Sequence, residues 1–213
     1  MLFKNTVSED LVSALNGLMQ LQSLKGFCLA GGTGLALQLG HRMSVDIDLF
    51  SSLDWDKTII KREIQEVFLL ASPERENRWG LRYTIKGIKV ELYNWEIPFL
   101  KPFLIEDHIR LASLEDISSM KLEAIKERKE RKDYYDLAIL LSQFTFAEMI
   151  SFYKTKYPYQ DTRVVLDALS AVDEAERTLD PPMLIDLSWG QAKDKIRSGF
   201  NQFVTEQKSS TRK

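Results

Sequence analysis

The stretch 27–50, FCLAGGTGLALQLGHRMSVDIDLF, constrains the fold of this chain more than any other part. It starts with the apolar run 27–30, which is typical of a buried strand. The turn GGTG at 31–34 interrupts that run, and residues that favour a helix follow. A glycine turn at a helix start gathers free backbone N–H groups at the positive end of the helix dipole. Such a turn is an anion-binding site, and phosphate is its usual ligand.

The last part of this stretch, VDIDLF, alternates apolar and acidic residues with the period of a strand. The alternation predicts that the apolar members, Val45 included, face the core, whereas Asp46 and Asp48 project from the opposite face. Two carboxylates about 7 Å apart on one strand face repel each other, so the pair indicates a counter-charge. Mg²⁺ prefers carboxylate oxygens and completes its shell with water and substrate phosphates.

A phosphate cradle followed by a carboxylate pair is the apparatus of phosphoryl or nucleotidyl transfer with two metal ions. The alternative is a strand with a solvated acidic face beside an ordinary glycine turn. Either half alone favours that alternative, because short motifs often match by chance. The two halves together, in this order and on these predicted elements, favour the functional interpretation.

These residues resemble the signature of a known superfamily. Gly32-Thr33, the helix after them and Asp46-Ile47-Asp48 are similar to the DNA polymerase β-type nucleotidyltransferases. The string GGTGLALQLGHRMSVDIDLF is similar to their AbiEii/AbiGii group, toxins of bacterial toxin–antitoxin and phage-defence systems. The resemblance continues to about Leu141 and more weakly beyond. It implies that Gly32 and Thr33, with Gly31 beside them, hold a nucleoside triphosphate (NTP), and that the two aspartates bind Mg²⁺, with two ions expected.

A third carboxylate is expected on a hairpin. The β runs 81–85 and 88–93 are joined by Lys86-Gly87, a strong hairpin signal. By the resemblance, Glu91 on the second run is a base for the acceptor hydroxyl or a third metal ligand. Many relatives carry Asp at this position. The alternative, an exposed strand glutamate paired with Lys89, stays open.

Between the predicted helix and the acidic pair lies Arg42. Two interpretations stay open for it, a contact to the triphosphate or a solvent-exposed loop cation. His41 and His108 show no metal partners in the sequence, so both are interpreted as structural or surface residues.

A second group of candidates lies on a helix predicted after Ser113. Lys121 falls within the apolar stripe of that helix, where an ammonium must either snorkel outward or meet an anion. The segment MKLEAIKERKERKDYYDL is similar to the family's second block. By that likeness, Lys121 contacts the NTP phosphates and assists catalysis.

Asp133 and Asp136 have the spacing of a helix N-cap and its third residue, which offers a structural explanation for at least one of them. The resemblance makes Asp136 a catalytic or nucleotide-contacting residue and Asp133 a nucleotide-contacting residue for which capping is the stronger alternative. The basic run 126–132, followed by two tyrosines, is either a solvated helix end or a patch that contacts RNA.

The expected fold is α+β. Residues 1–103 form a small mixed β-sheet of nucleotidyltransferase type flanked by helices, and 104–207 form a C-terminal helical bundle that packs on this core and contributes site residues. Residues 208–213 are expected to be a loose tail. A chain of 213 residues with 44% hydrophobic content supports a real core, and a net charge of −2 gives no global argument for nucleic acid.

We therefore expect a cytoplasmic Mg²⁺-dependent nucleotidyltransferase that moves a nucleotide from an NTP to an acceptor hydroxyl. The lone Cys28 in an apolar run, and a chain with neither a signal peptide nor a membrane-length apolar run, carry the cytoplasmic expectation. The acceptor is RNA, with the tRNA 3′ end suggested by the resemblance, or a protein; a small molecule such as an antibiotic is also chemically possible. The expected protein partner is a cognate antitoxin. The alternative function is a non-catalytic nucleotide-binding or partner-binding regulator with the same fold.

Overall fold

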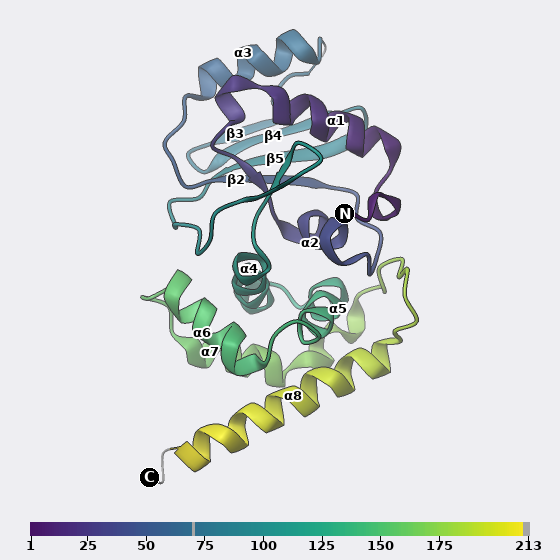
Figure 1. Ribbon diagram of the computed structural model, residues 1–213, viewed down its shortest axis with the longest axis vertical. Coiled ribbons are helices and arrows are strands. Elements are labelled where there is room, and N and C mark those ends of the chain that lie inside the picture. Colours follow the sequence, from purple (N-terminus) through teal and green to yellow (C-terminus); the bar gives the residue numbers. More distant parts are fainter. Residues whose placement is uncertain (70, 211–213) are drawn as a thin grey trace. The chain divides into compact units, whose positions relative to one another are not determined.

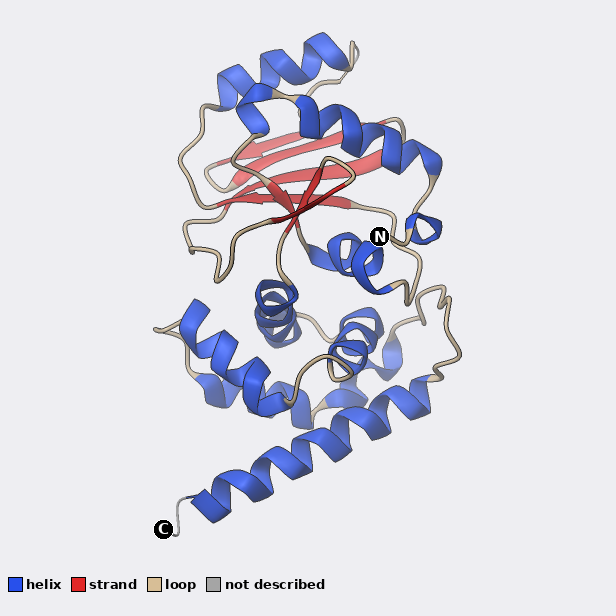
Figure 2. Cartoon of the chain, in the orientation of Figure 1, coloured by secondary structure: helices blue, strands red, loops and turns tan. Residues whose placement is uncertain are grey.

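The computed structural model describes residues 1–69 and 71–210, and the chain divides into two compact units, Met1–Ser113 and Leu114–Lys213. The first unit contains all seven strands, and the described part of the second is built from helices (Figure 1 and Figure 2). A sheet with flanking helices followed by a helical region is the α+β fold that the sequence predicts.

A seven-stranded mixed sheet forms the centre of the first unit, with strand order β3-β4-β5-β2-β1-β7-β6. β2 pairs in parallel with β5, β1 pairs in parallel with β7, and the other neighbours are antiparallel. The strands are β1 (Cys28–Leu29), β2 (Ile47–Ser51), β3 (Arg75–Asn77), β4 (Gly80–Ile85), β5 (Ile88–Asn94), β6 (Leu104–Glu106) and β7 (Ile109–Leu111).

The predicted hairpin is present. β4 and β5 pair around the two-residue turn Lys86-Gly87, and Ile85 lies opposite Ile88. Both turn residues have positive φ, 53° for Lys86 and 77° for Gly87, which a tight hairpin turn of this kind requires. The sheet also extends beyond residue 103, where the sequence predicts the end of the α/β part, because β6 and β7 follow that position.

Helices lie on both sides of the sheet (Figure 1). α1 (Glu9–Gln20) and α3 (Lys57–Val67) cover one face, and α2 (Gly31–Leu39) lies on the other side, with short 3₁₀ turns at Lys4–Thr6 and Gln22–Leu24. Both covering helices begin at a side-chain cap, because Ser8 accepts from the N–H of Leu11 and Asp56 accepts from the N–H of Thr58. The core between these helices and the sheet includes Leu11, Leu15, Leu18, Ile60, Ile64, Leu49, Val90 and Leu92.

The strand alternation separates this core from a polar face. Ile47 and Leu49 of β2 are fully buried in the core, and Asp48 between them points to the opposite face. Val45, which the alternation assigns to the core, is instead 68% exposed. The prediction fails there because β2 begins only at Ile47, so the period of a strand does not extend back to residue 45.

The connection between α1 and β1 is held by one arginine. The guanidinium of Arg110, on β7, donates hydrogen bonds to the carbonyls of Phe27 (2.8 Å), Met19 (3.1 Å) and Leu24 (3.0 Å). Burial lowers the pKa of this guanidinium. Arg110 therefore fixes the segment that leads directly into β1 and the glycine turn.

The second unit contains α4 to α8, and an additional 3₁₀ segment (η3) lies at Val172–Arg177. The helical bundle expected from the sequence is therefore confirmed. The expected loose tail at 208–213 is not, because residues 208–210 continue the last helix, and 211–213 lie outside the described residues. The helices are α4 (Leu114–Glu127), α5 (Arg131–Leu140), α6 (Phe146–Lys156), α7 (Thr162–Ser170) and α8 (Trp189–Ser210).

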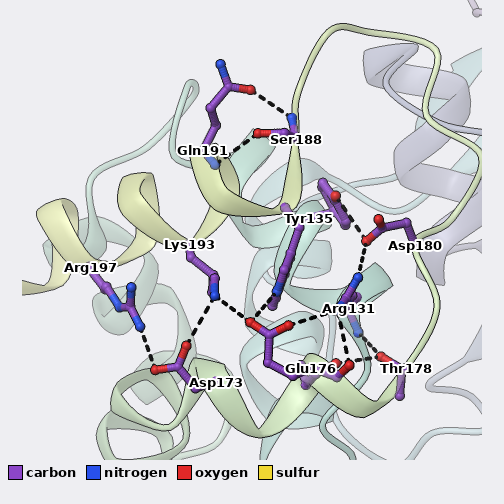
Figure 3. Close-up of polar contacts among 12 residues, drawn as sticks. Arg131, Tyr135, Asp173, Glu176, Thr178, Asp180, Ser188, Gln191, Lys193 and Arg197 are labelled. Atoms are coloured by element: carbon purple, nitrogen blue, oxygen red, sulfur yellow. Dashed lines mark hydrogen bonds and ion pairs between the residues drawn. The ribbon is translucent and has the colours of Figure 1, made fainter.

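A polar network joins α5, η3 and α8 within this unit (Figure 3). Arg131 donates to Asp180 (3.0 Å) and to Glu176 (2.9 Å), and its guanidinium lies 5.2 Å from the centroid of the Trp189 ring. The indole N–H of Trp189 donates to Glu176 (2.9 Å), which also pairs with Lys193. Hydrogen bonds from Lys193 and Trp189 lower the pKa of Glu176. Trp189 is a buried core residue.

Two observations concern Cys28 and the hydropathy of the helices. Cys28 is fully buried in β1, as expected for a core residue. Within residues 1–69 and 71–210, no helix combines the length and the apolar character needed to cross a membrane.

Candidate functional site

The glycine turn lies at the start of α2, directly after β1. Gly31 has φ +62°, and the Ala30 residue that precedes the helix provides no side-chain cap. The first backbone bond of the helix runs from the N–H of Gly34 to the carbonyl of Ala30 (3.0 Å). The N–H groups of the three preceding residues therefore lie in the first helical turn, where donors have no partner within the helix. This is the anion-binding geometry that the sequence predicts.

The acidic strand lies against this turn. A β-carbon placed on Gly31 would be 2.7 Å from Oδ2 of Asp48, so the carboxylate rests directly on the glycine. The N–H of Ala30 also donates to the carbonyl of Asp48 (3.1 Å). The structure thus brings the predicted phosphate cradle and one of the two predicted metal ligands together at a single place.

Arg42 is buried against the same turn. Its side chain is 4% exposed, and a β-carbon on Gly32 would collide with its guanidinium. Arg42 also donates to the carbonyl of Met43 (2.9 Å). The alternative of a solvent-exposed loop cation is therefore wrong, and a side chain at position 32 would displace the end of the Arg42 side chain.

Thr33 has a structural role in addition to its place in the turn. Its hydroxyl donates to the backbone carbonyl of Asp46 and forms a hydrogen bond of 2.8 Å with the hydroxyl of Ser44. The residue is 1% exposed. The hydroxyl of Thr33 therefore ties α2 to the segment that carries the acidic pair, and its backbone N–H lies in the first turn of α2.

The second predicted metal ligand, Asp46, lies just before β2 and is 36% exposed at its side chain. The ammonium of Lys89, on β5, lies 3.3 Å from Oδ2 of Asp46 and 3.1 Å from Oε2 of Glu91. Lys89 is thus a cation that bridges two of the predicted carboxylates. Although burial lowers its pKa, the hydrogen bond to Glu91 and the charges of the surrounding carboxylates outweigh burial and raise it.

Glu91 lies opposite Asp48 in the parallel pairing of β2 and β5, so three predicted acids share one region of the sheet. Its Oε1 accepts two hydrogen bonds from Arg82, of 2.9 Å and 2.7 Å, and its Oε2 pairs with Lys89. Burial raises the pKa of Glu91, but the hydrogen bonds from Arg82, Lys89 and Tyr93 outweigh it and the net pKa is lowered. A carboxylate with a lowered pKa and two cationic partners is a poor general base. The expected pair with Lys89 is present, yet Glu91 is only 13% exposed.

The geometry fits a divalent cation at the aspartates better than at Glu91. Among the side chains in the described ranges, no group of three or more His, Cys, Asp and Glu residues is arranged to hold a metal ion. Asp46 and Asp48 nevertheless provide hard oxygen ligands, and Asp46 already pairs with an ammonium. Mg²⁺ in such sites is commonly bound by one or two carboxylates together with substrate phosphates. Two aspartates fit that requirement. His41 is buried and His108 is exposed, as interpreted from the sequence.

The remaining candidates gather in the second unit. The ammonium of Lys121 lies 2.8 Å from Asp133 and 2.5 Å from Asp136, and all three side chains are at most 5% exposed. Arg128 adds two hydrogen bonds to Asp133, of 2.8 Å and 3.1 Å. Burial alone would raise the pKa of Asp133, but the charges and hydrogen bonds of Lys121 and Arg128 outweigh burial. The pKa of Asp133 is therefore lowered. Lys121 meets anions rather than snorkelling, and those anions are two aspartates of α5.

The capping explanation for Asp133 is wrong. Glu130 occupies the N-cap position of α5, and Asp133 lies within the helix with its carboxylate turned to Lys121 and Arg128. The two tyrosines after the basic run are not exposed to stack on a base of RNA, because Tyr134 is fully buried and Tyr135 is 1% exposed.

Sequence reasoning gave Arg82 no role and considered Lys89 only as a partner of Glu91. The signal that identifies Arg82 is the hairpin register. Once Ile85 lies opposite Ile88, counting outward places Arg82 opposite Glu91. The bridge from Lys89 to Asp46 depends on the parallel pairing of β2 and β5, which the sequence does not reveal.

Comparisons with known proteins match most of the chain. The model of the family described as nucleotidyl transferase AbiEii toxin, type IV toxin–antitoxin system, matches residues 13–206. A protein of Aquifex aeolicus (strain VF5), described as uncharacterized, is 31% identical over 174 residues, which cover 76% of this chain and 81% of that protein.

Two solved structures resemble the fold. JHP933 from Helicobacter pylori aligns with a TM-score of 0.58 and 15% identity, over 95% of this chain and 92% of that one. The antibiotic-resistance factor ANT(2'')-Ia aligns with a TM-score of 0.53 and 13% identity, over 77% of this chain and 97% of that one. At these identities the likeness is one of fold.

Proposed function

On the premise that the chain belongs to the AbiEii nucleotidyl transferase toxin family of type IV toxin–antitoxin systems, and is therefore a nucleotidyltransferase, we propose that it transfers a nucleotide from an NTP to an acceptor hydroxyl in a Mg²⁺-dependent reaction. The observation that carries this proposal is the contact between the Asp48 carboxylate and the glycine turn. A phosphate cradle and a carboxylate can act on one substrate only if they adjoin.

The roles of the residues follow from their geometry. The N–H groups in the first turn of α2, at Gly31, Gly32 and Thr33, bind the triphosphate with Arg42 beside them. Asp46 and Asp48 hold Mg²⁺. When bound, Mg²⁺ supplies neutralisation of phosphate charge and activation of the acceptor hydroxyl.

The transfer itself is a displacement at phosphorus. The oxygen of the acceptor hydroxyl forms a bond to the α-phosphorus while the bond from that phosphorus to the oxygen bridging the β-phosphate breaks. Pyrophosphate leaves with the electron pair of the broken bond, and the proton of the hydroxyl passes to water. Water is a better proton acceptor here than Glu91, because Arg82 and Lys89 already hold both oxygens of that carboxylate. Glu91 instead positions these two cations.

For the second unit we retain the prediction that Lys121 contacts NTP phosphates. For Asp133 and Asp136, predicted as nucleotide-contacting residues, we propose instead that they hold the Lys121 ammonium. Because both aspartates already pair with the Lys121 ammonium, a phosphate contact requires Lys121 to exchange one carboxylate partner for phosphate. Lys121→Met would then raise the KM for NTP, and an unchanged KM would exclude the contact.

The acceptor is proposed to be RNA, including the tRNA 3′ end, with a protein hydroxyl as the next candidate, and the protein partner is proposed to be a cognate antitoxin. The test is incubation of the protein with each of the four α-labelled NTPs, Mg²⁺ and bulk cellular RNA. Asp46→Asn and Asp48→Asn are expected to reduce labelling by about a hundred-fold or more while the fold is kept. Asp54→Asn, at an exposed position of the loop before α3, is the matched control. Full labelling by both site variants would refute this assignment.

One observation favours the second candidate, a regulator that binds nucleotide without turnover. Lys89 and Arg82 together balance the charges of Asp46 and Glu91, so these two carboxylates need no metal for charge balance. The two functions differ in the same assay, because a regulator would bind NTP and transfer no label.

A further inference from the structure

A cavity of about 490 Å³ lies where β4 begins and β5 ends, on the first unit. None of the roles above uses it. Its lining includes three aromatic residues, two arginines and an asparagine: Trp79, Tyr93, Trp95, Arg75, Arg82 and Asn77. Glu91 also lines the cavity, so the cavity adjoins the acidic region of the sheet.

The aromatic walls are held in place by the surrounding structure. Tyr93 stacks on Phe50 with ring centroids 4.6 Å apart and an interplanar angle of 17°, and Trp95 meets Phe50 edge-on at 5.5 Å. The Trp79 backbone is fixed on two sides, because its carbonyl accepts from the N–H of Asn94 (2.7 Å) and its N–H donates to the side chain of Asn77 (2.9 Å). Flat, pre-positioned aromatic rings are the surfaces on which planar ligands stack.

Amide groups supply hydrogen bonds beside these rings. Asn77 uses its side-chain oxygen to accept from the N–H groups of Trp79 and Gly80, which leaves its amino group as a donor. The side chain of Asn94 makes no hydrogen bond to the residues that the structure describes. Side-chain amides paired with aromatic walls suit the edge and face of a nucleobase.

The charge of the cavity selects an anionic ligand. Arg75 and Arg82 line it, and Arg78 lies over the ring of Trp79 at 4.2 Å. The one lining carboxylate, Glu91, is already matched by Arg82 and Lys89. A polycationic aminosugar would meet an excess of positive charge here, whereas a phosphate would be attracted.

The order of the strands places the cavity and the phosphate cradle on opposite sides of the acidic region. β1, which leads into the glycine turn, adjoins β2 with Asp48; β2 adjoins β5 with Glu91; and β4 and β3 lie beyond. In nucleotidyl transfer the attacking and leaving oxygens lie roughly in line across the phosphorus. If the leaving pyrophosphate occupies the cradle, the acceptor must approach from the side of β5, β4 and β3.

From this geometry we propose that the cavity is the acceptor pocket and binds the unpaired terminal nucleotide of a nucleic-acid strand. The base stacks on the walls formed by Trp79 and Trp95, and its phosphate lies near Arg75 and Arg82. The inference rests on the proposed transferase function for the identity of the ligand as acceptor, but binding by the pocket is measurable without transfer.

Binding is measured with the full-length protein and a single-stranded hexanucleotide of mixed sequence, labelled with a fluorophore at its 5′ end, without NTP or Mg²⁺. We expect Trp79→Ala to raise Kd at least about five-fold, the lower range for loss of one base–aromatic stack, and Trp79→Phe to restore most of the affinity. Trp79 is 49% exposed, so the fold should survive, and circular dichroism checks this. Tyr159→Ala, at an aromatic residue that is 99% exposed in the second unit, is the matched control.

A second pair of variants tests the charge. Arg75→Ala should weaken binding and reduce its salt dependence, whereas Arg62→Ala, on α3 with a side chain 69% exposed, should change neither. Ribose and deoxyribose versions of the strand distinguish RNA from DNA as the source of the nucleotide. A blunt duplex of the same sequence should bind more weakly, because its terminal base is paired.

The outcomes separate the two proposals. If Trp79→Ala binds the strand as wild type does, the acceptor pocket is excluded. The pocket is also excluded if Trp79→Ala weakens the binding of a cationic aminosugar but not the binding of the strand. If the wild type transfers label to nucleic acid and Trp79→Ala leaves the KM for that acceptor unchanged, the pocket fails and the transferase function stands. If no label is transferred but binding still depends on Trp79, the transferase function fails and the pocket stands. Asp48→Asn should lose transfer and keep binding.

Discussion

The carboxylate of Asp48 rests on the α-carbon of Gly31, so that a β-carbon at position 31 would come within 2.7 Å of Oδ2. Gly31 also has φ +62°, a conformation that costs other residues about 1–2 kcal/mol. Two separate penalties therefore act against any side chain at this position, and they can be told apart.

Gly31→Ala is expected to lower both the free energy of unfolding and nucleotide transfer, because the methyl group displaces the Asp48 carboxylate. Gly87→Ala is the matched control, since Gly87 has φ +77° and open space around it. Both variants are measured by urea unfolding and by label transfer. If Gly31→Ala and Gly87→Ala lose the same stability and both keep full transfer, the contact between Gly31 and Asp48 is not needed for nucleotide transfer.

Lys89→Met is expected to lower the Mg²⁺ concentration needed for half-maximal binding, because the ammonium that neutralises Asp46 and Glu91 is removed. Isothermal titration of the protein with MgCl₂ measures this directly. Lys61→Met serves as control, since Lys61 pairs with Glu76 and has a similar exposure, 35% against 40% for Lys89. An unchanged or weaker affinity for Mg²⁺ in Lys89→Met would mean that the metal does not share these carboxylates with the lysine.

Asp133 predicts an acid-dependent loss of stability. Its folded pKa is lowered by Lys121 and Arg128 against the opposing effect of burial, so its contribution is present above the unfolded pKa of about 3.9 and is lost as the pH falls through the lower folded pKa. Urea unfolding between pH 6 and pH 3 should show a smaller decline for Asp133→Asn than for wild type, from a lower starting value at pH 6. An equal decline in both proteins would mean that Asp133 does not cause the acid-dependent loss of stability. The control Asp54→Asn, at an exposed position, should behave as wild type does.

Arg110→Met is expected to destabilise the first unit by at least about 2 kcal/mol, because the carbonyls of Phe27, Met19 and Leu24 lose their shared donor. Arg110→Lys should recover only part of the loss, since an ammonium does not reproduce the planar fork of a guanidinium. Denaturant unfolding provides the measurement. If the methionine variant is as stable as wild type, water or rearranged backbone must satisfy the three carbonyls.

The elements that the sequence predicts well are those set by neighbouring residues. The Lys86-Gly87 turn specifies the hairpin of β4 and β5, as predicted, and the caps at which α1 and α3 begin, Ser8 and Asp56, are equally local features. These signals act over a few residues, and the tertiary structure keeps them. The cradle at Gly31 is of the same kind.

What the sequence does not reveal depends on pairing between distant segments. The role of Thr33 changes because Ser44 and Asp46 are brought to its hydroxyl, and the chemistry of Glu91 changes because Arg82 lies across the hairpin. The helix start of α5 differs from expectation because the Asp133 carboxylate gains more from Lys121 and Arg128 than from a cap. In each case a long-range partner outweighs a local preference.

The shortest strand of the sheet has a consequence for the order of events during synthesis. β1 consists of Cys28 and Leu29, and it is paired on one side with β2 and on the other with Leu111 of β7. Because so short a strand depends on both neighbours, the turn that follows it stays unformed while the ribosome is still making β7. We therefore expect the glycine turn at the start of α2 to take its final geometry only after β7 has been synthesised.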